Sequence, residues 1–227
     1  MIYKKIKHPE NSIFIIGGGH FGQRAARLLS KELSPEVVFV VDVDEKCLSD
    51  LDDLRINKIK DDGIDFLIGN HPSLDPDCTI VPAIPVHLAF EWLKKFIQEG
   101  YCIEKMPIPE EITGLLPNMQ CTDDGSVLTS YADFLCPDDC PEPEFCTVSG
   151  ERRQKPLYEL MGDLKPQGFG VCVIRSRQIA PGLGGYKVSD LTETAKRTTE
   201  PGFEKWLLGT ACKCHGILKA FKVEKAF

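Results

Sequence analysis

The 227-residue chain lacks three features that would place it in a well-defined class of protein. It has no apolar run long enough to cross a bilayer, so we expect no membrane insertion. Its net charge is −7 and it carries no basic stripe, which excludes bulk binding of nucleic acid through phosphate neutralisation. Residues 1–7 are basic but have neither the apolar core nor the cleavage site of a signal peptide. These absences predict a cytoplasmic protein.

Two further absences concern the second half of the chain and its cysteines. Residues 106–150 contain no Lys or Arg, although they hold many acids and six prolines. The chain also has no C-x2-C pair, the commonest signature of a zinc site. The change in composition predicts a boundary: a first domain at residues 1–105 and a cysteine-rich α/β region at residues 106–227.

The most informative feature that is present is a glycine-rich turn. Residues 13–16 form an apolar run typical of a parallel strand buried on both faces. Gly17, Gly19 and Gly22 follow it in the G-x-G-x-x-G spacing of a dinucleotide-binding unit. The first glycine allows a tight turn, the second admits a pyrophosphate, and the third lets helix and strand pack closely. The free N–H groups of the following helix would then face the phosphates.

The context of this turn supports the same interpretation. A helix with one apolar face follows it, and the apolar run 37–41 then ends in Asp42. This acid lies about 20 residues after Gly22, where a carboxylate that holds the ribose hydroxyls is expected. The alternative is an ordinary glycine turn before a helix, with Asp42 capping the end of a strand.

The residues after Asp42 indicate which dinucleotide is preferred. A carboxylate accepts the hydroxyls of a ribose and repels a 2′-phosphate. No Arg or Lys follows to offset that repulsion, because the next residues are Val43, Asp44 and Glu45. We therefore expect NAD(H) rather than NADP(H).

Further strands and helices extend the pattern. A short helix is expected over 45–54, an edge strand over 55–59 and another strand over 77–82. An amphipathic helix follows, ended by Gly100, and residues 101–104 resemble one more strand. The sequence thus predicts an α/β fold with a Rossmann-like parallel sheet.

The loop after the strand 77–82 is expected to face the ligand, since ligands bind at the carboxyl ends of parallel strands. Pro82 begins this loop and His87 ends it. His87 suits proton transfer, but the favoured interpretation is packing at the start of a helix. His20, within the glycine turn, is expected to lie near the cofactor.

The segments IIGGGHFGQRAARLL and VVFVVDVDE resemble the TrkA-N type of NAD-binding domain, which occurs in potassium-uptake regulators and in many stand-alone proteins. The resemblance covers about the first hundred residues and implies NAD binding by Gly17, Gly19, Gly22 and Asp42. The triple glycine is also similar to the NAD-dependent dehydrogenases of sirohaem synthesis, whose later residue pattern this chain lacks. The full set expected at the cofactor is Gly17, Gly18, Gly19, His20, Phe21, Gly22, Asp42, Val43 and Pro82.

The second half is distinguished by clustered cysteines. Cys136, Cys140 and Cys146 form a C-x3-C-x5-C run stiffened by prolines, and Cys212 and Cys214 lie in a C-x-C-H group. Soft metal centres use such thiolates, and an iron–sulfur cluster is favoured over zinc. Unligated or redox-active thiols are the alternative. The isolated cysteines are expected to be small buried side chains: Cys47, Cys78, Cys102 and Cys172.

The remaining elements of the second half are less distinctive. Residues 180–186 are glycine-rich and are expected to form a turn, with close approach to a phosphate as the alternative. Helices are expected over 156–164, 190–197 and 203–208, and strands over 169–175 and 215–223.

Two functions fit these expectations. One is an NAD(H)-binding redox protein or electron-transfer subunit with a metal centre. NADH donates a two-electron hydride and a cluster takes single electrons, so a flavin or a partner protein would have to bridge them. The other is a regulatory or scaffold protein that responds to NAD(H) without turnover. The sequence leaves open whether the protein is an enzyme and whether it forms a homo-oligomer.

Overall fold

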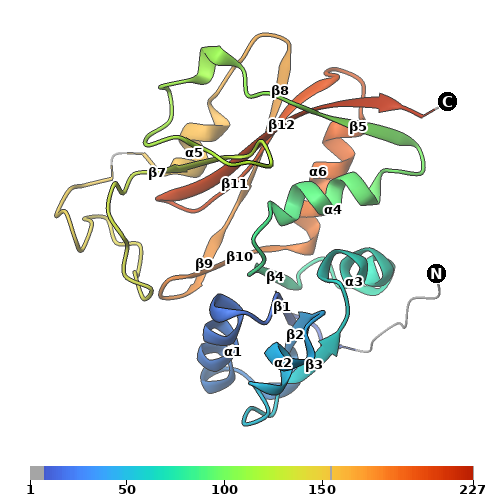
Figure 1. Cartoon of the computed structure of the whole chain (residues 1–227), viewed down its shortest axis with the longest axis vertical. Helices are drawn as coiled ribbons and strands as arrows, with labels where there is room; N and C mark the ends of the chain where they lie inside the picture. Colours follow the sequence, from blue (N-terminus) through green and yellow to red (C-terminus); the bar gives the residue numbers. More distant parts are fainter. Residues whose placement is uncertain (1–7, 154, 227) are drawn as a thin grey trace.

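The computed structural model describes residues 8–153 and 155–226, so the basic run at residues 1–7 lies outside the described part. The chain is a mixed α/β fold with two six-stranded sheets, one below the other in Figure 1. The lower sheet, sheet A, has the strand order β3-β2-β1-β4-β10-β9. The upper sheet, sheet B, has the order β6-β7-β12-β11-β8, with β5 also paired to β12.

The first four strands of sheet A run parallel, as the apolar runs predicted. They are β1 (Ile13–Ile16), β2 (Val38–Asp42), β3 (Asn57–Lys60) and β4 (Thr79–Pro82). All four residues of β1 are buried because helices and strands cover both faces of this sheet. The helices that connect these strands are α1 (His20–Glu32), α2 (Glu45–Ser49) and α3 (Gly63–Asn70), with 3-10 turns at Pro35–Val37 and His71–Ser73.

The glycine-rich segment 180–186 forms a hairpin. Strands β9 (Arg177–Ala180) and β10 (Leu183–Lys187) pair antiparallel, and Gly182 occupies the turn with φ +68°. Strand β10 pairs antiparallel with β4 through Tyr186 and Ile80. The prediction of a turn is therefore correct, and strands that the sequence did not predict extend sheet A on both sides of it.

Sheet B corrects two predictions. Strand β5 (Tyr101–Met106) is not part of the parallel core, because β10 takes the place beside β4 and β5 pairs antiparallel with β12 (His215–Lys225). Residues 203–208 are not a helix: they lead into β11 (Lys205–Ala211), which lies between β12 and β8 (Phe169–Arg175). A short apolar run of this kind cannot be assigned to helix or strand by periodicity alone. The remaining strands of sheet B are β6 (Gln120–Cys121) and β7 (Val127–Ser130).

Three hydrophobic clusters define the layers. Helices α1 and α2 cover the outer face of sheet A. Between the sheets lie α4 (Leu88–Phe96) and α6 (Val188–Thr199), whose apolar side chains pack with residues of α3 and of both sheets. Helix α5 (Leu157–Gly162) covers the far face of sheet B, and a 3-10 turn at Glu110–Ile112 joins the same cluster.

The central cluster contains residues from both sides of position 105. Phe14 and Phe90 share it with Trp206 and Phe221, and the rings of Phe90 and Phe221 are 5.4 Å apart. The predicted boundary near residue 105 stays a prediction. Among the helices described, none is both long and apolar enough to span a bilayer.

Candidate functional site

The glycine-rich turn joins β1 to α1 and depends on glycine at two positions. Gly17 has φ +107°, and a Cβ there would lie 2.4 Å from the Ala83 carbonyl oxygen. A Cβ at Gly22 would lie 1.9 Å from the Gly17 carbonyl oxygen, so α1 packs directly on the turn. Gly19 differs, because a Cβ there would meet nothing within 4 Å. The turn is therefore closed towards the sheet and open at Gly19.

The open side of the turn coincides with the amino end of α1. Gly19 is the N-cap of this helix and supplies no side-chain cap. The first-turn N–H groups and the positive end of the helix dipole are therefore available to an anion. Phe21 beside them is 65% exposed.

Asp42 faces the same turn from the carboxyl end of β2. Its Oδ2 accepts a hydrogen bond from the Gly18 N–H at 2.5 Å, and its Oδ1 accepts one from the Asp44 N–H at 2.7 Å. Val43 beside it is 62% exposed. The surroundings of Asp42 are acidic. Burial is the largest cause of a raised pKa at the nearby Cys47 thiol, and the charges of Asp42 and Asp44 raise that pKa further. A carboxylate has further lone pairs, so these two bonds leave Asp42 able to accept from a ligand hydroxyl.

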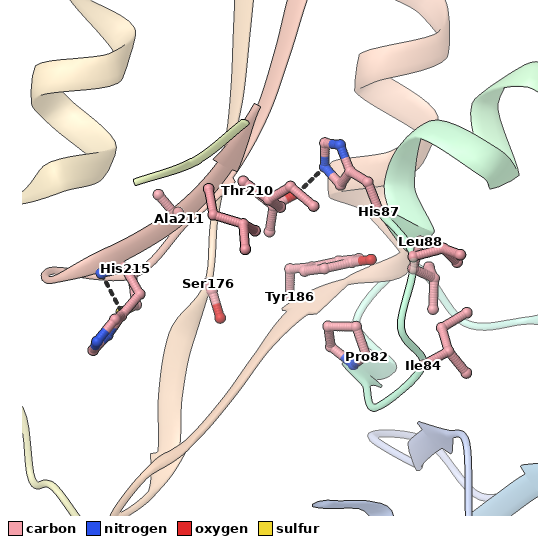
Figure 2. Close-up of a pocket in the computed structure, with 14 residues that line it drawn as sticks. Pro82, Ile84, His87, Leu88, Ser176, Tyr186, Thr210, Ala211 and His215 are labelled. Carbon is pink, nitrogen blue, oxygen red and sulfur yellow. Dashed lines mark hydrogen bonds between the residues drawn. The ribbon is translucent and has the colours of Figure 1, made fainter. Parts of the chain in front are cut away.

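A pocket of about 360 Å³ opens where β4 ends (Figure 2). It extends from the loop after Pro82, past Tyr186 of β10, to the adjoining ends of β11 and β12. None of its lining residues is Asp, Glu, Lys or Arg. The lining comprises Pro82, Ile84, Val86, His87, Leu88, Leu128, Ser176, Tyr186, Thr210, Ala211, Cys212, His215, Gly216 and Ile217.

His87 is buried at the N-cap of α4. Its Nε2 lies 2.9 Å from the Thr210 hydroxyl, and its Nδ1 has no hydrogen-bond partner among the described residues. Burial, with the charge of Lys219 as a second cause, lowers the pKa of His87 to about 3. The imidazole is therefore neutral at physiological pH.

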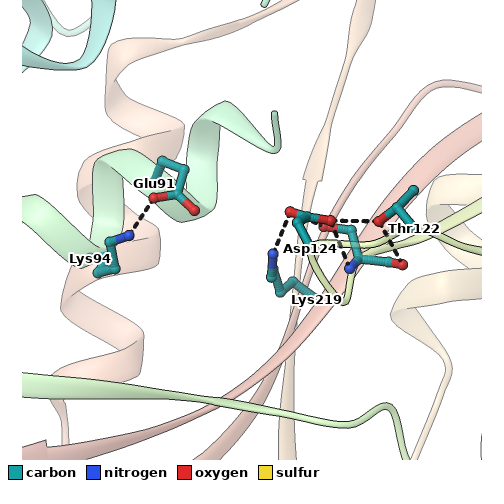
Figure 3. Close-up of polar contacts among 6 residues, drawn as sticks. Glu91, Lys94, Thr122, Asp124 and Lys219 are labelled. Carbon is teal, nitrogen blue, oxygen red and sulfur yellow. Dashed lines mark hydrogen bonds and ion pairs between the residues drawn. The ribbon is translucent and has the colours of Figure 1, made fainter. Parts of the chain in front are cut away.

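Lys219 lies in the middle of β12 and is only 1% exposed. Figure 3 shows its side chain reaching Asp124. Its Nζ pairs with Asp124 Oδ2 at 2.6 Å and lies 5.0 Å from the centre of the Phe90 ring. Hydrogen bonds from Lys219 and then from the Thr122 hydroxyl hold the pKa of Asp124 well below its usual range. The carboxylate of Asp124 balances the buried charge of Lys219. The charge of Lys219 adds to the effect of burial in keeping His87 uncharged.

Two of the cysteine-containing turns direct backbone N–H groups at sulfur. Cys212 Sγ accepts from the Cys214 N–H at 3.4 Å and from the His215 N–H at 3.3 Å. Hydrogen bonds from the backbones of Ser149 and then Val148 lower the pKa of the Cys146 thiol to about 7. Such N–H donors stabilise a thiolate, the form of cysteine that ligates metals.

The predicted ligands lie in one neighbourhood without forming a metal site. Cys136 Sγ is 3.5 Å from His215 Nε2, whereas Cys212 Sγ is 3.9 Å from His215 Nδ1. Two different ring nitrogens thus face the two sulfurs, and one ion cannot take all three groups in this arrangement. In the described part of the chain, no three His, Cys, Asp or Glu side chains are placed to hold a metal ion. Burial, with Glu142 as a further cause, raises the pKa of Cys212 to about 12.

The charge of Arg153 acts on three of these thiols, Cys136, Cys146 and Cys214. Arg153 donates a hydrogen bond to Cys214, which opposes the effect of burial on the pKa of that thiol. Its guanidinium lies 5.3 Å from the centre of the Tyr131 ring. The Arg153 Nε is buried without a partner among the described residues. Arg152, by contrast, pairs with Glu144 at the surface.

The loop Cys136–Cys140, called the cysteine loop below, lies next to the glycine turn, although the two are far apart in sequence. Asp138 lies 4.0 Å from His20 at the start of α1. The Gly182 N–H donates to the Cys140 carbonyl at 2.8 Å, which holds the loop on the β9–β10 hairpin. The Cys136–Cys140 loop thus lies beside the open end of α1.

The sequence missed several residues of these sites. Tyr186 and Thr210 gave no signal, because a strand pattern does not tell which neighbours complete a pocket. Lys219 did leave a signal in the sequence. It is a charged residue within an apolar strand, and the residues that follow it, Ala220 and Phe221, are buried. Of the isolated cysteines, Cys78 and Cys172 are buried as predicted, Cys47 is partly buried, and Cys102 is exposed on β5.

Comparison with known proteins finds a family model for the later part of the chain and a relative that covers most of its length. A family model described as "Uncharacterized protein, C-terminal domain" matches residues 89–224. A protein of Archaeoglobus fulgidus, described as "Uncharacterized protein", is 32% identical over 225 residues, covering 92% of this chain and 98% of that protein. No solved structure matches.

Proposed function

The chain belongs to the family defined by that C-terminal domain, and we propose that it is an NAD(H)-binding redox protein that carries a cysteine-ligated metal centre. One observation carries the dinucleotide half of this proposal: the glycine turn is closed towards the sheet, open at Gly19, and faced by Asp42. We place the protein in the cytoplasm. All ten cysteines are free, which suits a reducing compartment.

In this proposal the diphosphate lies against the open side of the turn. The N–H groups of the first turn of α1 donate to it, and Gly19 leaves room for its approach. Asp42 would accept from the adenosine ribose hydroxyls, and the exposed Val43 would offer an apolar surface to the adenine. The acids around Asp42 would repel a 2′-phosphate, which favours NAD(H). When bound, the nicotinamide supplies hydride chemistry, and Pro82 and the loop that follows it bound its position.

The metal half of the proposal is supported by the chemistry of the donors. Cys146 already receives the N–H···S hydrogen bonds that stabilise a thiolate, and Arg153 supplies a positive charge beside Cys214. The Cys214 and His215 N–H groups also donate to Cys212, although burial still raises the pKa of that thiol to about 12. The residues that would hold the centre are Cys136, Cys140, Cys146 and one or both of Cys212 and Cys214. An iron–sulfur cluster is preferred to zinc, since four thiolates would ligate a [4Fe–4S] cluster and the adjacent Arg153 would offset the negative charge of the thiolate-bound cluster.

The dinucleotide site is tested with Asp42→Ala. We expect the variant to bind NADH more weakly by about 1–3 kcal/mol, because charge-assisted hydrogen bonds to the ribose are lost. Isothermal titration calorimetry measures the affinity, with NADPH as the second ligand. Asp52→Ala, a surface acid that pairs with Lys58, is the matched control and should leave binding unchanged. Equal NADH affinity in the parent and Asp42→Ala would contradict the ribose assignment.

The metal centre is tested with Cys146→Ser. Protein purified without oxygen should contain iron and sulfide, or zinc, and the variant should lose most of it because a prepared thiolate is removed. Elemental analysis and the visible absorption spectrum measure the content. Cys102→Ser, on the exposed strand β5, should keep the parent content. Parent protein that is folded and metal-free would refute this half of the proposal.

A second function is favoured by the contact between His20 and Asp138. Because this contact joins the cysteine loop to the start of α1, a dinucleotide bound there would alter the loop, and the protein would act as an NAD(H)-responsive regulator. The two functions differ in turnover. A redox enzyme or electron carrier consumes NADH in the presence of an acceptor or a redox partner protein, whereas a regulator changes shape or partner and leaves NADH intact.

A further inference from the structure

The imidazole of His215 separates two of the thiols that were predicted as metal ligands. Its Nε2 lies 3.5 Å from Cys136 Sγ, and its Nδ1 lies 3.9 Å from Cys212 Sγ. Because the two sulfurs approach different nitrogens of one ring, a metal centre bonded to both would have to occupy the place of that ring. Cys136 and Cys212 therefore cannot share a centre while His215 keeps its position.

Cys212 already has a structural role in the turn between β11 and β12. Its Sγ accepts hydrogen bonds from the Cys214 and His215 N–H groups, and its thiol donates one to the Glu142 carboxylate. A thiolate at this position would lose the bond to Glu142 and would lie beside a second negative charge. These contacts favour Cys214 as the ligand that the turn supplies.

Cys214 has a different partner, the guanidinium of Arg153, which donates a hydrogen bond to it. The Arg153 side chain is only 10% exposed, and its Nε has no partner among the described residues. The carboxylate paired with Arg153 belongs to Glu151, which lies 3.7 Å away and is 74% exposed. A buried cation with so weak a counter-charge is costly, so this guanidinium indicates that a further negative charge belongs beside it.

The other three thiols lie around the same guanidinium. The charge of Arg153 acts on Cys136 and Cys146. Cys140 and Cys146 act in turn on Cys136. Cys140 also acts on Cys214. Because the effect of a charge weakens with distance, the four thiols and the guanidinium are neighbours.

We propose that Cys214, and not Cys212, supplies the fourth thiolate of the metal centre, and that Arg153 is the positioning residue that balances its charge. This assignment rests on the metal centre of the proposed function. The sulfurs are not arranged about one point in the described part of the chain, so binding must draw them together. Each thiol gives its proton to water as its metal–sulfur bond forms. The complete ligand set is Cys136, Cys140, Cys146 and Cys214, which suits a [4Fe–4S] cluster or zinc.

The fourth ligand is tested with Cys214→Ser and Cys212→Ser, both purified without oxygen and checked for folding by circular dichroism. Cys214→Ser should lose most of the iron and sulfide, or zinc, measured per chain. Cys212→Ser should keep the parent content, because serine can still donate to Glu142. If the parent is loaded and Cys212→Ser loses as much metal as Cys214→Ser, the assignment is wrong and the metal centre stands. A folded parent without metal would refute both.

A second measurement needs no variant. In the parent chain, iodoacetamide should modify Cys214 only after a chelator has removed the metal, because coordination occupies the sulfur. The modification of Cys212 should be the same before and after. A metal-dependent change at Cys212 alone would overturn the assignment.

The role of Arg153 is tested by the rate at which the loaded protein gives its metal to a chelator. Arg153→Gln should release the metal about tenfold faster, because the charge beside the thiolates is lost. Arg153→Lys keeps a positive charge and should recover part of the retention. Arg152→Gln is the matched control, since Arg152 pairs with Glu144 at the surface, and it should release at the parent rate. Equal rates in Arg153→Gln and Arg152→Gln, or no recovery in Arg153→Lys, would refute this role.

Discussion

At the scale of single residues, His87 makes the stability of the fold depend on pH. Its pKa is about 3 in the folded chain, because it is buried and lies near the charge of Lys219, whose effect Asp124 partly opposes, and about 6.5 when unfolded. Between these values the unfolded chain binds a proton that the folded chain does not. The free energy of unfolding therefore falls as the pH falls through this window, by up to about 1.4 kcal/mol per pH unit.

We predict that His87→Gln removes this share of the acid sensitivity. The amide can still bond to Thr210 and does not take up a proton. Urea unfolding at intervals from pH 7 to pH 4 measures the slope in the parent and the variant. His20→Gln, at an exposed position, is the control and should keep the parent slope. Identical slopes in the parent and His87→Gln would contradict the assignment.

The sequence predicted residues whose chemistry follows from local spacing. The positions of Gly17, Gly22 and Asp42 relative to two strands indicated a turn faced by a carboxylate, and the structure places them so. Tyr186 and Arg153 were not assigned roles because their surroundings come from distant segments. A side chain that gains its environment from other strands leaves no local pattern to detect.

At the scale of elements, the β9–β10 hairpin is the support of the cysteine loop. Gly182 in its turn has φ +68°, and a Cβ there would lie 1.6 Å from the Asp138 carbonyl oxygen. The hairpin and the loop thus touch backbone to backbone. A side chain at position 182 must displace one of them.

We predict that Gly182→Ala costs about 2–4 kcal/mol of unfolding free energy and lowers the metal content, because it adds a clash to an unfavourable φ. Gly114→Ala isolates the second effect: Gly114 has φ +82°, but a Cβ there would meet nothing within 4 Å. This control should cost about 1 kcal/mol and keep its metal. Denaturant unfolding and elemental analysis measure both. Equal costs in the two variants would show that the hairpin does not support the loop.

Helices and strands were predicted best where apolar residues covered one face of a helix or both faces of a strand. Helix α1 and strands β1 and β2 follow from periodicity and from the glycine turn. Strand β11 was mistaken for a helix because its Trp206–Leu208 run is short and apolar, and β5 was placed in the wrong sheet. Which sheet a strand joins depends on competition between segments: β10 occupies the edge of β4, and β5, which was expected to extend the parallel core, pairs with β12 instead.

At the scale of the whole molecule, the two sheets share one core. Phe90 of helix α4 packs against Phe221 of sheet B, and Trp206 of β11 and Tyr186 of β10 belong to the same cluster. A chain that ends at residue 105 would lose the strand beside β4 and expose the apolar face of α4. The first 105 residues therefore lack the partners that bury their own hydrophobic surface.

We predict that the full chain unfolds in one cooperative transition and that the fragment 1–105 shows none. Calorimetry and circular dichroism in urea measure this, with the full chain as the reference. A fragment with a sharp transition of its own would show that the first half folds independently and that the shared core is dispensable for it.

The buried amine of Lys219 offers a way to count open molecules. Reagents that acylate amines modify lysines at the surface, but Lys219 is 1% exposed and its ammonium is paired with Asp124. It should stay unmodified as long as β12 keeps its place, and it becomes reactive only when the strand separates from its neighbours. The modified fraction at this one position, read by mass spectrometry, would then record how often the sheet opens under conditions in which almost every molecule is folded.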